Sequence, residues 1–281
     1  MRSADMTRSI FAGTIAEMTY PEVESAAGRD ATMLVPIGVI EEHGPHLPLG
    51  TDVYAAHTLC RLVKRHGAEL GVEILIAPPF FWGVNHVTAA FPGTFRTRTE
   101  VAAGLLEDIL GTLVDDGFAR IFVINHHGDL AHNRMVREVL HDQHQRGRRD
   151  IRWLEERDMV ERLGDDGTES IWATYERSPE ADSLRRSEAL GVHAHELETA
   201  VIARYFPELV DFDILDALEP TSLDHGDLVA WRQGGERARS LTPRGYFGAP
   251  QPVDPDLWRH YDFTARAMAQ TIQDLAPVEA R

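Results

Sequence analysis

Short apolar stretches alternate with longer stretches of helical periodicity along the first half of the chain. The apolar, β-branched runs at 32–38 (TMLVPIG) and 119–125 (ARIFVIN) predict buried strands, and 72–80 (VEILIAPPF) and 150–156 (DIRWLEE) predict two more. Apolar residues spaced as on one helix face predict the intervening helices, at 53–70, 99–117 and 131–149. Apolar strands separated by amphipathic helices indicate an α/β fold with a parallel sheet covered on both faces.

The second half of the chain has weaker patterning. Residues 162–190 are polar and irregular, and we interpret them as an insertion or a lid within a single domain that spans residues 1–281. Residues 234–256 are rich in glycine and proline, so we expect loops there. No internal repeat or low-complexity segment divides the chain.

Composition places the chain among ordinary globular proteins. Of its 281 residues, 43% are hydrophobic and 26% are charged. No apolar run approaches the roughly 18 residues that a membrane span needs, so no membrane association is expected. The N-terminal segment has no apolar stretch followed by a small-residue cleavage site, which predicts a cytoplasmic location.

Charge and reactive side chains exclude some functions. The formal net charge of −17 argues against nucleic acid as a partner. Cys60 is the only cysteine and lies in an apolar helical pattern, so we expect a buried structural thiol. Lys64 is the only lysine and is predicted on a polar helix face, which leaves one candidate for Schiff-base chemistry.

Acidic residues and histidines gather where the predicted strands end. The strand 32–38 runs into Glu41 and His43, and the strand 119–125 runs into NHHGDLAHN (125–133). A third cluster, HAHELETA (193–200), precedes an apolar helical stretch. Because ligands of α/β proteins bind beyond the carboxyl ends of the strands, we expect a functional site there.

The residue types in the first cluster are those of a metal site. Glu41 and His43 are two residues apart, so in extended backbone their side chains point to the same side. Asp52 follows a turn shaped by the glycines and prolines of residues 44–50. Carboxylate and imidazole ligands together suit Zn²⁺, Mn²⁺ or Fe²⁺, and one carboxylate can bridge two ions roughly 3.5–4 Å apart.

Four motifs together resemble the creatininase family. The segment PIGVIEEHGPHLPLGTD (36–52) is similar to the family signature P-x-G-S-x-E-Q-H-G-P-H-L-P-L-x-T-D. FFWGVNHVTAAFPGTF (80–95), INHHGDLAHN (124–133) and HAHELETA (193–200) resemble further family motifs, in family order. The resemblance covers about residues 32–250. The first motif is long and specific, and the others are looser.

The resemblance implies a three-layer α/β/α fold with a mostly parallel sheet, in a protein that is often hexameric. Family members are metal-dependent amidohydrolases that open the lactam of creatinine, remove formamide groups or trim a peptide in cofactor maturation. We therefore expect metal-activated water to cleave a C–N bond of a small cyclic amide, formamide or related substrate. One or two divalent ions are expected, Zn²⁺ first, with Mn²⁺ or Fe²⁺ as alternatives.

The resemblance also assigns roles to residues. The metal ligands of the family match Glu41, His43, Asp52 and His127, with Asp52 as the bridge between ions. Asp129 lies where creatinine-hydrolysing members place a ligand Glu, one methylene longer. Two further residues are expected to take part in catalysis: Glu198, as a ligand or a close partner of the metal, and His193, which matches a histidine proposed to handle protons.

Departures from the family pattern lie at substrate-contact positions. His126 and His195 each stand where the family has glycine, which argues against creatinine as the substrate. His86 and Trp82 are further candidates for substrate contact, although bracing of their loop and core packing are equally good explanations.

Two other functions remain open at this point. A peptidase-like maturation factor of the same family would act on a peptide tail and would need a wide, open pocket. A non-catalytic metal-binding protein would instead fill every coordination position with its own ligands, whereas a catalytic site leaves one open.

Overall fold

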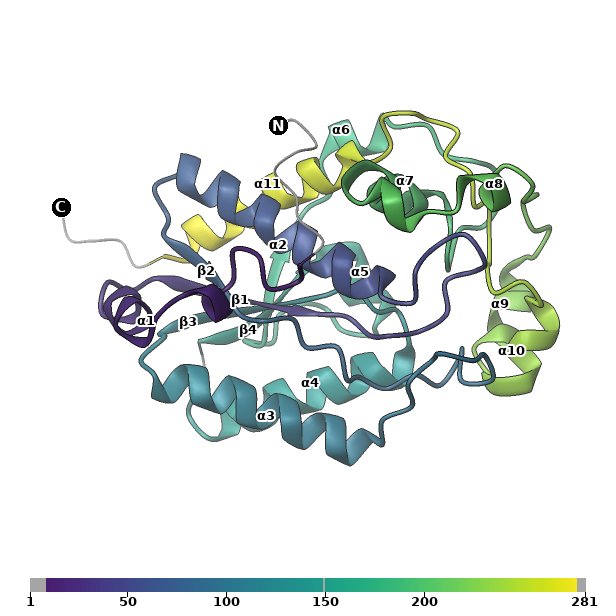
Figure 1. The fold of residues 1–281 in the computed structure, drawn as a ribbon. Helices are drawn as coiled ribbons and strands as arrows, with labels where there is room; N and C mark the ends of the chain where they lie inside the picture. The colour runs from purple at the N-terminus through teal and green to yellow at the C-terminus, as the bar shows by residue number, and fades with distance from the viewer. Residues whose placement is uncertain (1–8, 149, 277–281) are drawn as a thin grey trace.

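Five parallel strands form one sheet in the order β2-β1-β3-β4-β5 (Figure 1). The structure is a computed structural model that describes residues 9–148 and 150–276. The strands are β1 (Thr32–Ile37), β2 (Ile74–Ile76), β3 (Arg120–Asn125), β4 (Ile151–Glu156) and β5 (Trp172–Tyr175).

Helices connect the strands and cover the end of the sheet. The longer ones are α1 (Tyr20–Ala27), α2 (Thr51–Glu69), α3 (Thr99–Asp115), α4 (Leu130–Gln145), α7 (Glu196–Tyr205) and α11 (Arg259–Asp274). The shorter ones are α5 (Arg157–Arg162), α6 (Pro179–Asp182), α8 (Phe212–Leu215), α9 (His225–Trp231) and α10 (Gly235–Leu241), with 3-10 turns at Ile15–Glu17 and Pro207–Leu209. Among the described residues, no helix is both long and apolar enough to cross a membrane.

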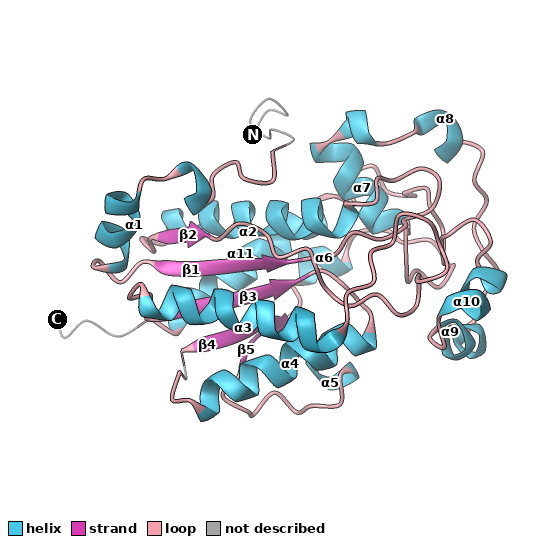
Figure 2. Cartoon of the chain, turned by 60° about the horizontal axis from the view of Figure 1, so that its bottom comes forward, coloured by secondary structure: helices cyan, strands magenta, loops and turns pink. Residues whose placement is uncertain are grey.

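Helices pack on both faces of the sheet (Figure 2). On one face, α1, α3 and α4 bury their apolar sides against Met33 and Val35 of β1. On the other face, α2 and α11 pack against Leu34 of β1 and Phe122 of β3. Successive residues of a strand point to opposite faces, so the fully apolar strands supply two cores. The predicted α/β fold with a covered parallel sheet is confirmed.

Several boundaries differ from the prediction. The strand predicted at 72–80 pairs only over Ile74–Ile76, because Pro78 and Pro79 interrupt it before an isolated bridge between Phe80 and Ile37. The helix predicted at 53–70 begins at Thr51 instead, and those predicted at 99–117 and 131–149 end at Asp115 and Gln145.

Two segments that were expected to be irregular contain regular structure. The segment 162–190, interpreted as an insertion or a lid, includes β5, which pairs with β4 as the edge strand. Trp172 and Ala173 of this strand are buried, so this part is core and not a lid. Four residues are too short to show a strand pattern between polar flanks. Likewise, the glycine-rich segment 234–256 contains α10.

The chain order places a crevice between β1 and β3. From β1 the chain passes through α2, on one face, to β2 on one side of β1. From β2 it passes through α3, on the other face, to β3 on the other side of β1. At such a switch point the connections diverge and leave a ligand site at the carboxyl ends of the two strands.

Candidate metal centre

Five acidic and histidine side chains converge at this crevice. Glu41 and His43 lie in the loop after β1, and His127 lies in the loop after β3. Asp52 and Glu198 lie in the first turns of α2 and α7. The positive end of the helix dipole stabilises a carboxylate in a first turn by about 0.3–1 kcal/mol. Asp52 therefore follows the expected turn and is held in the first turn of α2.

The ligand atoms form two groups of three that share Asp52. In the first, the Glu41 cluster (Glu41, Asp52 and His127), His127 Nδ1 lies 3.0 Å from Glu41 Oε1 and 3.1 Å from Asp52 Oδ2. In the second, the Glu198 cluster (His43, Asp52 and Glu198), His43 Nε2 lies 3.3 Å from Asp52 Oδ1 and 3.8 Å from Glu198 Oε1. Each Asp52 oxygen thus faces a different cluster.

Both imidazoles present the nitrogen that a cation needs. His127 donates from Nε2 to the carbonyl of Val84 at 3.1 Å, which leaves Nδ1 toward the Glu41 cluster. His43 donates from Nδ1 to the carbonyl of Glu41 at 3.2 Å, which leaves Nε2 toward the Glu198 cluster. Such hydrogen bonds to the far nitrogen are how proteins orient metal-ligating histidines.

The side chains of both clusters are buried, and not all of their polar atoms have hydrogen-bond partners. Glu41, Asp52 and Glu198 are 3%, 2% and 7% exposed. Burying a charge costs roughly several kcal/mol unless it is compensated. Asp52 Oδ2 and His43 Nε2, both buried, have ion-pair contacts at 3.1 Å to His127 Nδ1 and 3.3 Å to Asp52 Oδ1, but no well-aligned hydrogen bond to a described residue. A carboxylate and imidazole donor set that packs its buried donor atoms against one another in this way fits one or two divalent cations.

The imidazoles partly balance the carboxylates. Burial acts to lower the pKa of His127, but the carboxylates of Glu41 and Asp52 raise it well above its usual value. Burial acts to raise the pKa of Asp52, but His43 and the neighbouring histidines hold it well below its usual value. A cation would replace the imidazole protons, so its binding should release protons.

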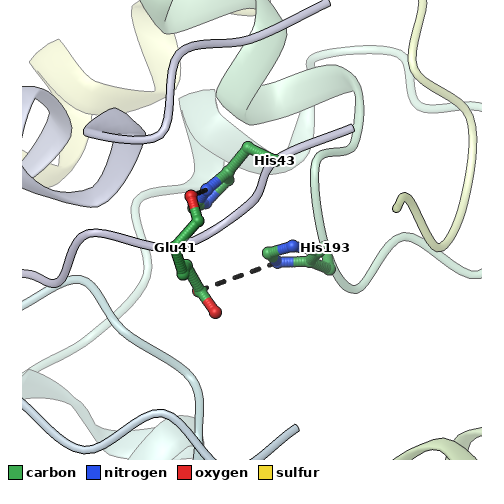
Figure 3. A group of neighbouring side chains, drawn as sticks. All are labelled: Glu41, His43 and His193. Carbon is green, nitrogen blue, oxygen red and sulfur yellow. Dashed lines mark hydrogen bonds and ion pairs between the residues drawn. The ribbon is translucent and has the colours of Figure 1, made fainter. Parts of the chain in front are cut away.

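His193 lies beside Glu41 and His43, as the close-up shows, and the three side chains form a further group whose potential ligand atoms lie within 4.8 Å of one another (Figure 3). Its Nε2 donates to the carbonyl of Glu42 at 2.7 Å, and its Nδ1 lies 4.0 Å from Glu41 Oε1. Burial acts to lower the pKa of His193, but Glu41 and Glu42 raise it to about 10. The next residue, Ala194, has φ of +48°, and this left-handed turn separates His193 from His195.

Asp129 does not join either cluster. Its Oδ1 accepts from the amide of Ala131 at 2.8 Å and thereby caps α4. Its Oδ2 accepts from the amides of His86 and Val87 at 2.7 and 2.9 Å. Backbone amides therefore occupy both oxygens of this short side chain, which braces a loop in place of the metal contact expected of it.

A cleft of about 660 Å³ opens onto the clusters. Of the four candidate substrate residues, His86 and His126 line this cleft. His195 lines a neighbouring pocket instead, and its Nδ1 lies 3.0 Å from Glu198 Oε2. Trp82 lines neither, because its ring packs edge-to-face on Phe95 at 5.3 Å.

Other residues at the site were not predicted. The ring of Trp231 lies 5.7 Å from that of His193, and Arg232 lines the mouth of the cleft. The hydroxyl of Tyr261, on α11, is hydrogen-bonded to His126. None of these residues belongs to an acidic or histidine-rich motif, so the sequence carried no local signal for them.

Similar proteins match different shares of the chain. A mycofactocin precursor peptide peptidase of Mycolicibacterium smegmatis is 37% identical over 97 residues, 34% of this chain and 39% of that protein. A creatinine amidohydrolase of Pseudomonas putida is 30% identical over 129 residues, 43% of this chain and 46% of that protein. A mycofactocin precursor peptide peptidase of Mycobacterium ulcerans is 28% identical over 223 residues, 78% and 75% of the two chains. The matched stretches thus span less than half the length of the first two relatives.

Solved structures and a family profile extend the similarity to most of the chain. A creatinine amidohydrolase (creatininase) superposes with a TM-score of 0.69 at 19% identity, over 97% of this chain and 100% of that chain. A manganese creatininase gives 0.68 at 19% identity, over 95% and 99%. These likenesses show the fold. The profile of the creatininase family, described as creatinine amidohydrolase, matches residues 16–271, and the chain therefore belongs to this family.

Proposed function

We propose that this protein is a metal-dependent hydrolase that cleaves a C–N bond of a small cyclic amide, formamide or related compound. The observation that carries the proposal is the pair of three-residue clusters sharing Asp52 at a cleft. When bound, divalent ions would supply Lewis acidity, which lowers the pKa of water from about 15.7 toward 7 and polarises a carbonyl. Water adds to the carbonyl carbon and the C–N bond breaks, which gives a carboxylic acid and an amine; the two groups stay in one molecule when the amide is cyclic.

In this proposal Glu41 and His127 would hold one ion, His43 and Glu198 would hold the other, and Asp52 would supply an oxygen to each. Glu198, and not Asp129, completes the set, since backbone amides occupy both Asp129 oxygens. Zn²⁺ is the first candidate, with Mn²⁺ or Fe²⁺ as alternatives. Solved creatininases include a manganese form and a zinc–zinc form, which is compatible with this choice.

His193 is the proposed proton donor. Its Nε2 is tied to the carbonyl of Glu42, so Nδ1 is the atom that can deliver a proton toward the cleft. Glu41 and Glu42 raise the pKa of His193 against the effect of burial in the metal-free site, so two carboxylates beside the ring favour its protonated form there. Donation to the leaving nitrogen would let it depart as a neutral amine.

A second candidate function is the trimming of a peptide. Two observations favour it: the relatives from Mycolicibacterium smegmatis and Mycobacterium ulcerans are named peptide peptidases, and a second pocket of about 1450 Å³ adjoins the cleft. Non-catalytic metal storage is disfavoured, because each cluster supplies three protein ligands and opens onto a cleft, so a coordination position is left for water.

The test is a hydrolysis screen over lactams, formamides, ureas and short peptides, with amine release as the readout. Wild-type protein loaded with Zn²⁺ or Mn²⁺ should release amine, and chelated protein and the Asp52→Asn variant should not. Activity on peptides alone would select the second candidate. Turnover by metal-free protein, or full turnover by Asp52→Asn, would refute the metal assignment.

We also propose a homo-oligomer in the cytoplasm, with the hexamer of related proteins as the first candidate. An exposed aromatic pair, Trp82 at 41% and Phe95 at 52%, supports a protein contact at this surface. Light scattering should give a mass that is a multiple of 31.5 kDa, and a mass of one chain would contradict the proposal.

A further inference from the structure

A second pocket, of about 1450 Å³, adjoins the cleft that opens onto the two clusters. His126 and Val192 line both cavities, so the second pocket lies directly beside the cleft, and a substrate that spans the two would pass these side chains. The polar side chains of the second pocket include Glu155, Arg186, Ser187, Glu196, His260 and Tyr261. The proposed reaction uses none of them.

Two buried polar atoms of this pocket lack partners. Glu196, the first residue of α7, is 4% exposed, and its Oε1 accepts from the amide of Ser187 at 2.9 Å. Its Oε2 is buried and receives no hydrogen bond from the described part of the chain, and the same holds for Ser187 Oγ. An unpaired buried carboxylate oxygen costs about 1–3 kcal/mol, so a ligand that donates to it is strongly favoured.

A cationic side chain, the exposed Arg186, lines the same pocket. Arg186 makes no hydrogen bond or short ion pair with the residues that the structure describes, and it interacts electrostatically with Glu196. Arg177 differs, because its guanidinium binds Glu156 Oε1 at 2.6 Å and is satisfied. The pocket therefore offers a buried carboxylate oxygen without a hydrogen bond and, beside it, the guanidinium of Arg186; Arg162 is a second arginine on its lining.

We propose that the second pocket binds a zwitterionic amino-acid head group, with its ammonium on Glu196 and its carboxylate on Arg186. A ligand with a cation alone would be repelled by Arg186, and one with an anion alone would be repelled by Glu196. A zwitterion satisfies both groups. This inference rests on the proposed function, since it places the scissile amide at the other end of the same substrate, beside His126 and the clusters.

The test uses a series of side-chain formylated amino acids: Nγ-formyl-diaminobutyrate, Nδ-formyl-ornithine and Nε-formyl-lysine. Each is compared with its α-N-acetyl form, which lacks the ammonium, and its α-carboxamide, which lacks the carboxylate. Binding is measured by calorimetry on metal-loaded and on chelated protein. Each cap should weaken binding of the best-fitting member by about tenfold or more, in both metal states.

Variants assign the two contacts. Glu196→Gln retains an oxygen for the Ser187 amide, so the fold should persist, but it should weaken the uncapped ligand about tenfold and leave the α-N-acetyl form unaffected. Arg186→Gln should weaken the uncapped ligand about tenfold, because the contact to the carboxylate is lost. It should leave binding of the α-carboxamide form unaffected. Glu188→Gln, an exposed residue of the same segment, is the matched control and should bind like wild type.

Three results would overturn the inference: equal binding of capped and uncapped ligands, no binding by any member of the series, or wild-type binding by Glu196→Gln. Wild-type binding by Glu196→Gln would mean that Glu196 forms an ion pair with Arg186 and does not bind the ammonium of the ligand. If Glu196→Gln does not fold, the comparison of capped ligands on wild-type protein decides. Selective binding with no hydrolysis of this series or of any compound in the screen above would refute the proposed function and support the inference, whereas hydrolysis without head-group preference would do the reverse.

Discussion

Gly38 follows β1 directly and touches the backbone of α2 where that helix begins. A Cβ atom added at Gly38 would lie 2.7 Å from the backbone carbonyl carbon of Asp52 and from the backbone nitrogen of Val53. It would lie 2.8 Å from the backbone carbonyl oxygen of Asp52. Ordinary contacts of a Cβ begin at 3.4 Å. The Gly38→Ala variant therefore has to push the start of α2 away from β1 by about 0.7 Å, the difference between these contact distances.

The displacement moves a ligand residue of both the Glu41 cluster and the Glu198 cluster, because Asp52 belongs to each. Overpacking of this kind costs about 1–3 kcal/mol, which for a chain of this length lowers the melting temperature by roughly 2–6 °C. A reacting group misplaced by about 1 Å can lose roughly 100-fold in rate, so we expect kcat/KM to fall about 10- to 100-fold. The affinity for metal should fall as well, since the ligand atoms of both clusters separate.

Metal titration, thermal unfolding and turnover of the two proteins test this expectation. Gly104→Ala is the matched control, since Gly104 lies exposed on α3 and a Cβ there meets no atom within 4 Å. That variant should be unchanged in activity and about 0.5–1 kcal/mol more stable, from the helical preference for alanine. If Gly38→Ala keeps the melting temperature, metal affinity and turnover of the wild type, the argument that β1 positions Asp52 through this contact is refuted.

Further predictions concern charge, packing and the two clusters. Burial raises the pKa of Glu155 from 4.5 to about 7, so folding favours its protonated form. The contribution of this group to the free energy of unfolding is fully present below pH 4.5 and is lost as the pH rises through 7. Glu155→Gln should therefore exceed wild type in stability by up to about 3 kcal/mol at pH 8 and by almost nothing at pH 4, in urea titrations; equal differences at both pH values would contradict this. Leu110→Ala empties a fully buried position and should cost about 2–5 kcal/mol of unfolding free energy. Chelation of metal held at about 100 times its Kd should remove about 2.7 kcal/mol of stability for each bound ion, measured by thermal unfolding.

The sequence predicted the parts of the fold that have strong periodicity. The apolar runs at β1 and β3 are buried on both faces of the sheet, so each stands out as an uninterrupted run. Because the chain enters the site directly from these strands, Glu41, His43 and the segment 125–133 could be placed there from the sequence, and the resemblance to the creatininase family then singled out His127. The four residues of β5 could not, since a short edge strand between polar segments has no period of its own.

The details of the site depend on contacts between distant segments. Asp129 and Glu198 were equal candidates in sequence, and the difference between them arises from helix ends. Asp129 is the N-cap of α4, and its oxygens accept hydrogen bonds from backbone amides. Glu198 lies in the first turn of α7 and faces His43. Trp231 and Tyr261 reach the site from α9 and α11, and only the packing of these helices determines that they do.

The central claim is that two metal clusters share one carboxylate, and the metal content of the purified protein tests it most directly. After loading with Zn²⁺ and removal of the excess by gel filtration, elemental analysis of wild-type protein should give two ions per chain. Asp52→Asn should retain almost none, because both clusters lose the same ligand. One ion per chain in the wild type, or two in Asp52→Asn, would contradict the account.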